Sequence, residues 1–263
     1  MDWTRAASAI RTKLSGRGRD ARPEKPAEPA IVEIEHAGER FPVRLRRSTR
    51  ARRISLRVSQ ATGEIVMTMP ARAALDRAML FARGQGGWIA ARIARMPGRV
   101  PFADGAILPL RAEPHRIVHW SRVRGRAHVA AAADGAPIIA VSGEAEFLAK
   151  RVREFLQREA RADLVAAVER YTQALGLPAR KITLRDTRSR WGSCSSRGDL
   201  SFSWRLILAP PFVLDYLAAH ECAHLAQMNH SSRYWRLLRE ICPRTNEAEA
   251  WLKAHGAGLH RYG

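Results

Sequence analysis

Apolar and polar residues alternate with a period of two from residue 31 to residue 69. Turn residues interrupt the alternation at Ala37-Gly38 and at Gly63. Such alternation places apolar side chains on one face of a sheet and charged side chains on the other. The pattern predicts an antiparallel meander with one buried face, whose apolar positions are Val32, Ile34, Val43, Leu45, Ile54, Leu56, Val58, Ile65, Met67 and Met69.

The spacing becomes helical between residues 71 and 96, where Leu75, Met79, Ile89 and Ile93 recur on one face. Glycines at positions 84, 86 and 87 weaken this helix, because glycine costs about 1 kcal/mol in a helix interior. Residues 100–143 then alternate short apolar runs with turn signals such as Asp134-Gly135. These runs predict further antiparallel strands.

A long amphipathic pattern predicts a helix from Glu144 to Leu175, ended by Gly176. Two strands are expected after it, one at Ile182 and Leu184 and one in which apolar residues alternate from Leu200 to Leu206. The turn between them is assigned to residues 195–199. A last helix is predicted over residues 246–254.

The order of these elements predicts an α+β fold, with an antiparallel β-rich N-terminal part followed by a compact helical core with a small sheet. The expected organisation is a disordered basic tail over residues 1–30, a β-rich region over 31–143, a core over 144–256 and a loose C-terminus over 257–263. The tail is rich in Gly, Pro and charge, so it cannot bury enough apolar surface to become ordered.

The strongest chemical signal is the H-E-x-x-H pattern formed by His220, Glu221 and His224. Residues four apart share one helical face, so both imidazoles can bind one metal ion. Glu221 then lies close enough to act on water without being a ligand. Pro210-Pro211 and the apolar residues after them favour a helix here. This combination is typical of a catalytic zinc site with an open coordination position.

We assign the third ligand to His230, ten positions after His220. The chain can turn near Asn229, and Ser231 can cap a following helix. A later helical glutamate is the alternative, with Glu240, Glu247 and Glu249 as the candidates. Three histidines leave the fourth position open for catalysis and favour one Zn²⁺ per chain, although nickel, cobalt and iron also accept imidazole ligands.

The chain resembles the YgjP-like metallopeptidase-domain family, which is related to the SprT-like zinc proteins. The run Arg190-Trp191-Gly192-Ser193-Cys194, the H-E-x-x-H helix and the segments Met228-Asn229-His230-Ser231 and Tyr234-Trp235 carry the resemblance, which extends over about residues 40–256. It implies an N-terminal β-rich part followed by a zincin-like metallohydrolase core. It also implies that His220, His224 and His230 are zinc ligands and that Glu221 is the catalytic base. Gly84-Gln85-Gly86-Gly87 departs from the unbroken helix of the family pattern.

The resemblance also implies a sheet beside the active helix, with one strand able to hold an extended peptide by edge pairing. Arg188, Arg190 and Trp191 then lie near the cleft as candidates for substrate contact, although packing is the first interpretation of Trp191. A second electrophile is needed to stabilise the developing oxyanion, and Tyr216, Tyr234, Arg188 and Arg190 are the candidates. The primary hypothesis is a zinc-dependent peptidase that acts on peptides or proteins.

The net charge of +20 is unusual, and residues 1–100 carry 21 Lys and Arg against nine Asp and Glu. A basic field of this size favours polyanionic partners such as nucleotides or nucleic acid, while a merely solvated arginine-rich face is the alternative. The candidate polyanion-binding residues are Arg44, Arg46, Arg47, Arg50, Arg52, Arg53 and Arg57. Two alternative functions follow, a metal-dependent nucleoside triphosphate pyrophosphohydrolase and a DNA-associated, SprT-like protease or binding module.

The chain has three cysteines, at positions 194, 222 and 242, and no C-x-x-C pair. An odd count without close spacing favours a reducing compartment over a disulfide scaffold. No secretory or membrane-spanning segment is predicted, since proline and aspartate interrupt the most apolar stretch. We therefore expect a cytoplasmic protein. The sequence does not predict its oligomeric state.

Overall fold

The computed structural model describes residues 30–59, 62–96, 98–121 and 125–263. Its α+β class, with a β-rich N-terminal region followed by helices and small sheets, confirms the predicted fold class. Almost all of the predicted basic tail lies outside the described residues. Among the described helices, none is both long enough and apolar enough to cross a membrane.

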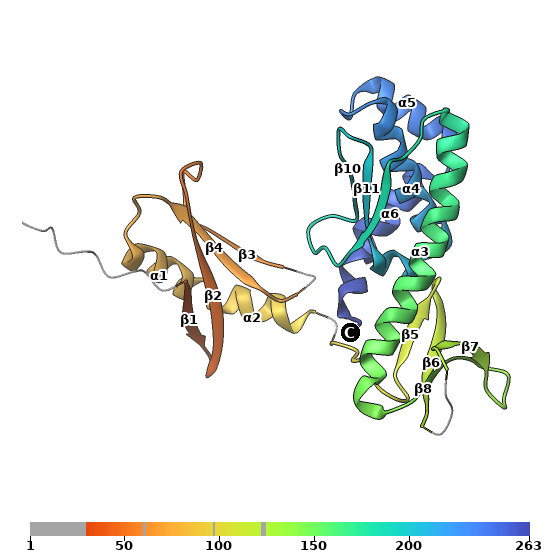
Figure 1. The fold of residues 1–263 in the computed structure, drawn as a ribbon. Coiled ribbons are helices and arrows are strands. Elements are labelled where there is room, and N and C mark those ends of the chain that lie inside the picture. The colour runs from red at the N-terminus through yellow and green to blue at the C-terminus, as the bar shows by residue number, and fades with distance from the viewer. Residues whose placement is uncertain (1–29, 60–61, 97, 122–124) are drawn as a thin grey trace, which may run out of the picture.

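The first part of the fold, which we call the N-terminal unit, comprises residues 31–96 and has its own hydrophobic core (Figure 1). Its sheet has the strand order β1-β2-β4-β3, and two helices pack against its apolar face. The alternation seen in the sequence provides that face, with Val43, Ile65 and Met67 fully or almost fully buried. Its elements are β1 (Ile31–His36), β2 (Glu39–Ser48), β3 (Ser55–Val58), β4 (Ile65–Pro70), α1 (Leu75–Gly84) and α2 (Gly86–Ala94).

The pairing in this sheet is not antiparallel throughout, as the meander prediction requires. β1–β2 and β3–β4 are antiparallel, but β2 and β4 run parallel. The reason is that β3 and β4 form a hairpin around Gly63, at φ +71°, and β4 rather than β3 then pairs with β2. Period-two alternation identifies the buried face of each strand but not its neighbour.

The helix predicted over residues 71–96 is broken at Gln85, between α1 and α2. Gly86 lies against His36 of β1, and a Cβ atom at this position would be 2.7 Å from the Cβ atom of His36. Glycine therefore allows the start of α2 to approach the sheet closely. The break occurs within the four residues that depart from the family pattern.

A second sheet follows, with strand order β5-β6-β8-β7 and one parallel pair, β6–β8. Its buried residues, including Leu108, Ile117 and Ile139, join the larger hydrophobic core rather than that of the N-terminal unit. That core extends from Phe102 to Leu259, and we call residues 102–263 the C-terminal unit. The second sheet thus shares its core with the residues after 143, whereas the sequence predicts a boundary at residue 143 between a β-rich region and the helical core. The strands are β5 (Ile107–Leu110), β6 (Glu113–Trp120), β7 (His128–Ala131) and β8 (Pro137–Ser142).

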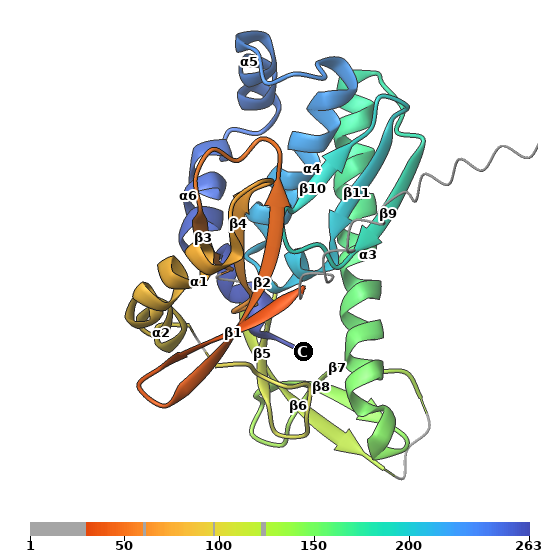
Figure 2. The ribbon, with the colours of Figure 1, turned by 90° about the vertical axis from the view of Figure 1, so that its left-hand side faces the viewer.

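The helix α3 (Leu148–Leu175) runs along the whole C-terminal unit (Figure 2). It follows a short 3₁₀ turn (Ala145–Phe147) and ends at Gly176, whose φ of +65° is the left-handed conformation predicted for that glycine. Its apolar face packs against α4 (Pro211–Ala226) and the 3₁₀ helix that precedes it. Two further helices, α5 (Ser232–Ile241) and α6 (Thr245–His255), complete the unit.

The third sheet has the order β10-β11-β9, which leaves β10 at an edge. Its strands are β9 (Lys181–Arg185), β10 (Gly192–Cys194) and β11 (Asp199–Ser203). The turn at 195–199, predicted to join the two expected strands, instead joins β10, which was not predicted, to β11. β9, the first expected strand, pairs with β11 in parallel. The second strand does not continue to Leu206. Ser203 caps a 3₁₀ helix (Trp204–Leu208) whose five residues are all buried. Because every residue of this helix is buried, apolar residues occupy the positions that an alternating strand would also make apolar.

The prediction of a loose C-terminus is wrong. Residues 256–261 form a 3₁₀ helix (Gly256–Arg261) in which Leu259 and His260 are buried. The amide of Val100 donates to the carbonyl of Arg261, and the amide of Gly263 donates to the carbonyl of Val100, both at 2.9 Å. The end of the chain is thereby fixed against the segment that enters the C-terminal unit.

Candidate metal centre

The helix α4 presents His220 and His224 one turn apart on the same face. Its first residue is Pro211, which suits a first helical position because it lacks the N–H group that would remain unpaired there. The helix is buried on almost all sides, with Ala218, Ala219 and Cys222 fully inaccessible. The two histidines are thus held on a rigid element inside the core.

His230 returns to this face from the segment after α4. The chain leaves the helix through an extended Gln227, at φ −140° and ψ 97°, rather than through a left-handed Asn229. Ser231 then caps α5 by accepting a hydrogen bond from the amide of Tyr234 at 3.4 Å, as the sequence predicts. Ligand atoms of His220, His224 and His230 all lie within 4.8 Å of one another.

The spacing of the ring nitrogens fits a single tetrahedral ion. The Nε2 atoms of His220 and His230 are 3.3 Å apart. Two nitrogens bound to tetrahedral zinc at about 2.0–2.1 Å are separated by about 3.3–3.4 Å. The arrangement therefore brings two imidazoles to the separation expected of ligands that share one ion.

Hydrogen bonds on the other ring nitrogens fix which atom faces the centre. Nδ1 of His224 lies 3.0 Å from the carbonyl of Gln227, to which it donates. Nδ1 of His220 lies 3.2 Å from the hydroxyl of Tyr216, which in turn donates to Glu249 at 3.0 Å. Both contacts leave Nε2 free for a metal, as second-sphere partners of ligating histidines commonly do.

Two aromatic rings pack against the histidines. Tyr234 stacks on His224 with ring centroids 4.6 Å apart, and its hydroxyl donates to the carbonyl of His220 at 3.1 Å. Trp235 stacks on His230 at 5.7 Å. Tyr234 is fully buried, so α5 closes one side of the centre and restrains the orientation of its rings.

Glu221 is only 4 % exposed and lies beside the centre, on the side of β10. Burial raises the pKa of Glu221 to about 7, while the charge of Arg190 lowers it. A Cβ atom on Gly192 would come within 2.4 Å of Oε1 of Glu221. The carboxylate therefore occupies space that exists only because β10 begins with glycine.

Burial also favours neutral histidines at the centre. It lowers the pKa of His220 to about 4, with smaller contributions from His224 and His230. The pKa of His224 is lowered mainly by burial, in opposition to its hydrogen bond to Gln227. Neutral imidazole is the form that binds metals.

The glutamates considered as alternative ligands lie elsewhere. Glu247 pairs with Arg244, with its carboxylate oxygens 2.6 and 2.7 Å from the guanidinium. Glu249 accepts the hydrogen bond from Tyr216 and so acts on His220 through that residue. Glu240 is exposed on α5. Among the described residues, only the three histidines form a cluster suited to a metal.

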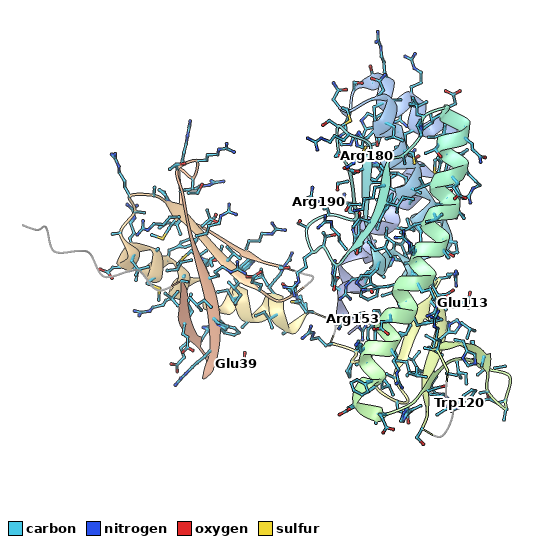
Figure 3. The ribbon with its side chains drawn as sticks, in the orientation of Figure 1. Glu39, Glu113, Trp120, Arg153, Arg180 and Arg190 are labelled. Carbon is cyan, nitrogen blue, oxygen red and sulfur yellow. The ribbon has the colours of Figure 1, made fainter. Side chains whose placement is uncertain are left out.

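The hydroxyls of Tyr216 and Tyr234 are both occupied by hydrogen bonds behind the ligands. Arg188 and Arg190 are exposed in the segment before β10, and Arg190 lies on the side of the C-terminal unit that faces the N-terminal unit (Figure 3). Trp191 is half-buried, with its ring 5.0 Å from that of His260. The arginines, rather than the tyrosines, are thus available to a bound substrate.

The arginines between residues 44 and 57 have different surroundings. Arg44 pairs with Glu64, and Arg47 donates to the carbonyls of Ala71 and Ala73 at 2.8 Å. Arg52 and Arg53 line a cavity with Arg77 of α1, whereas Arg57 faces a different cavity. Arg46 and Arg50 are exposed.

Comparison with known protein families also points to metal-dependent peptide hydrolysis. A sequence model described as the YgjP-like metallopeptidase domain matches residues 52–255. The chain belongs to this family. Membership confirms the resemblance carried by the H-E-x-x-H helix and its surroundings, and it identifies the protein as a metallopeptidase-family hydrolase for which a metal and a peptide or protein substrate are implied.

Among solved structures, the chain is similar to the metallopeptidase zymogen abylysin of Pyrococcus abyssi. The sequence identity is 22% and the TM-score 0.31, and the match covers 33% of this chain and 89% of that one. No curated protein matches the chain.

Sequence reasoning missed three contributions to the site. Gly192 was noted only as part of the family resemblance, because its value depends on a contact with Glu221 that local sequence does not reveal. The carbonyl of Gln227 is a partner for His224 only once the helix ends there. Tyr216 was considered as an electrophile, although its position four residues before His220 indicates a contact with that ring.

Proposed function

We propose that the protein is a zinc-dependent metallopeptidase in which His220, His224 and His230 hold the ion and Glu221 is the general base. The convergence of three imidazoles, with two Nε2 atoms 3.3 Å apart, beside one buried carboxylate carries the proposal. Family membership supports peptide hydrolysis as the reaction. Three nitrogen ligands, two of which (His220 and His224) have their tautomers fixed by hydrogen bonds, suit zinc with an open position.

When bound, zinc supplies a Lewis acid that lowers the pKa of water and polarises the carbonyl under attack. Glu221 accepts a proton from the attacking water at its carboxylate and delivers it to the leaving nitrogen. The surrounding helices and β10 keep this carboxylate out of bulk water and fix its direction.

The edge strand β10 is the proposed support for the substrate. It has a neighbour on one side only within its sheet and contacts α4. An extended peptide pairing with it would have its backbone aligned beside Glu221. Arg190 is the proposed stabiliser of the developing oxyanion, since its charge acts on Glu221 and its side chain is exposed.

The test is Glu221→Gln in the full chain, assayed on a peptide library by mass spectrometry with zinc measured in the same sample. Loss of a general base lowers the rate by about 10²–10⁴-fold. We expect such a loss with zinc retained, because the three ligands are unchanged. Glu240→Gln, an exposed glutamate on α5, is the matched control and should cleave at the wild-type rate. Wild-type cleavage by Glu221→Gln would place the base elsewhere.

A further inference from the structure

A cavity of about 470 Å³ lies between the N-terminal and C-terminal units, beside the proposed substrate strand. We call it the arginine pocket. β3 and α2 contribute one wall through Arg57, Trp88 and Arg92, and the segment before β10 contributes the other through Arg188 and Arg190. The two units thus supply two arginines each to one cavity.

Among the described residues, no acidic side chain lines the arginine pocket. Within the described part of the chain, none of its four arginines forms an ion pair. The adjoining cavity differs, because Glu64 and Asp186 line it together with arginines. Four guanidinium groups that face one space, with no carboxylate in its described lining, repel one another, and an anionic ligand would relieve that repulsion. The pocket is therefore complementary to several negative charges.

The arginine pocket is linked to the proposed active site by the chain segment that enters β10. Arg190 and Trp191 line the pocket and directly precede Gly192, the first residue of β10, which touches Glu221. An extended peptide advances about 3.3 Å per residue, so a peptide paired with β10 would reach the pocket within a few residues of the bond beside Glu221. Carboxylates on such a segment match the forked donors of arginine.

The aromatic residues of the pocket favour a peptide over a single-stranded nucleic acid. Binding of single strands depends on open aromatic faces on which successive bases stack. Trp191 already packs against His260, at 5.0 Å between ring centroids, and a Cβ atom on Gly256 would lie 3.2 Å from its ring. Only Trp88, 45 % exposed, offers an open ring in this pocket.

We propose that the arginine pocket binds an acidic segment of the protein substrate, next to the residues held along β10, and so selects substrates with clustered carboxylates. The proposal rests on the proposed peptidase function for its link to cleavage. Binding of the acidic segment depends on Arg57, Arg92 and Arg188, leaves Arg190 to the developing oxyanion, and does not require Glu221.

The test uses the full chain with Glu221→Gln, loaded with zinc, so that binding is measured without cleavage. The probes are a labelled peptide that contains a run of glutamates and the same peptide with glutamines, followed by fluorescence anisotropy at low and high salt. The pocket variant adds Arg57→Gln and Arg92→Gln. The control adds Arg72→Gln and Arg83→Gln, which remove the same charge from exposed positions outside the pocket.

We expect the glutamate peptide to bind about tenfold more tightly than the glutamine peptide, as a few charge-assisted contacts provide, and salt to reduce the difference. The pocket variant should lose most of that difference, and the control should keep it. Equal binding of the two peptides, or an unchanged difference in the pocket variant, would overturn the proposal.

Two further arms separate the competing explanations. If an oligonucleotide or a nucleoside triphosphate displaces the glutamate peptide at lower concentration than the unlabelled peptide does, and the pocket variant abolishes that displacement, the acidic-peptide proposal is overturned. If wild-type protein binds the glutamate peptide through the pocket but cleaves no peptide, the binding proposal is supported and the proposed peptidase function fails.

Discussion

The N-terminal unit has far more arginines than acidic residues, whereas several arginines of the C-terminal unit are held in ion pairs. Residues 31–96 contain thirteen arginines and five acidic residues, so most of these arginines cannot be paired within the unit. In the C-terminal unit, Arg205 is 7% exposed and lies 2.6 Å from Asp186 and 4.5 Å from the ring centre of Trp204. Arg111 similarly pairs with Asp163 at 2.8 Å and with Glu159 at 3.1 Å.

This difference separates charges that are paired within the fold from charges that are exposed to solvent. A buried guanidinium with all its partners satisfied stabilises the local structure only as long as those partners remain. An exposed guanidinium without a partner adds little to stability and repels its neighbours. The four arginines of the pocket are of the second kind although two of them belong to the C-terminal unit. Position relative to the site, rather than the unit of origin, sets their role.

The largest effect on stability should come from Arg205→Met. This change removes the pair with Asp186 and leaves the carbonyls of Leu259 and Tyr262 without their donor. We expect the free energy of unfolding to fall by about 3 kcal/mol, measured by urea titration. Arg57→Met, the same chemical change on the exposed face of the N-terminal unit, should shift it by no more than about 0.5 kcal/mol. Equal shifts in the two variants would remove the distinction between the units.

The next largest effect concerns activity, and Gly192→Ala should produce it. The added Cβ atom would lie 2.4 Å from the carboxylate of Glu221 and displace it. Displacing a reacting group by about 1 Å can reduce the rate about 100-fold, so we expect kcat/KM to fall by about that factor while zinc content stays at the wild-type level. Gly258→Ala, where no atom lies within 4 Å of the added Cβ, is the control. Full activity in Gly192→Ala would show that Glu221 does not act from this position.

A smaller effect on the free energy of unfolding is expected when the pH is lowered. Burial lowers the pKa of His260 in the folded protein, and the charges of Arg205 and Arg188 lower it further against the opposing effect of Asp186. The unfolded chain binds the proton more readily, with a pKa near 6.5, so this contribution to stability is complete above about pH 6.5 and declines below it. Urea midpoints at pH 7.5 and 5.5 should therefore differ less in His260→Gln than in the wild type. The same pH slope in both proteins would exclude His260 as its origin.

The sequence predicts the features that depend on neighbours along the chain. Helical spacing locates α3 and α4, Gly176 ends α3 as expected, and the H-E-x-x-H pattern brings His220 and His224 together. The capping role of Ser231 is also local and is confirmed. In each of these cases, residues within about one helical turn determine the outcome.

The features that escaped prediction depend on contacts between distant segments. The parallel pairing of β2 with β4 requires knowing which strand is the neighbour, and the buried 3₁₀ helix after Ser203 imitates a strand. The C-terminal tail is ordered through Val100, about 160 residues earlier in the chain. The role of Gly192 likewise becomes visible only when β10 is placed against Glu221.

The most direct test of the central claim is the zinc content of the purified 263-residue protein, measured by elemental analysis after equilibration with limiting zinc. The wild type should hold about one zinc per chain. His230→Ala should lose it, and Tyr216→Phe, which removes the partner of Nδ1 of His220, should weaken affinity about 10–100-fold. A wild type that binds no zinc, or a His230→Ala variant that binds it as tightly as the wild type, would contradict the three-histidine centre.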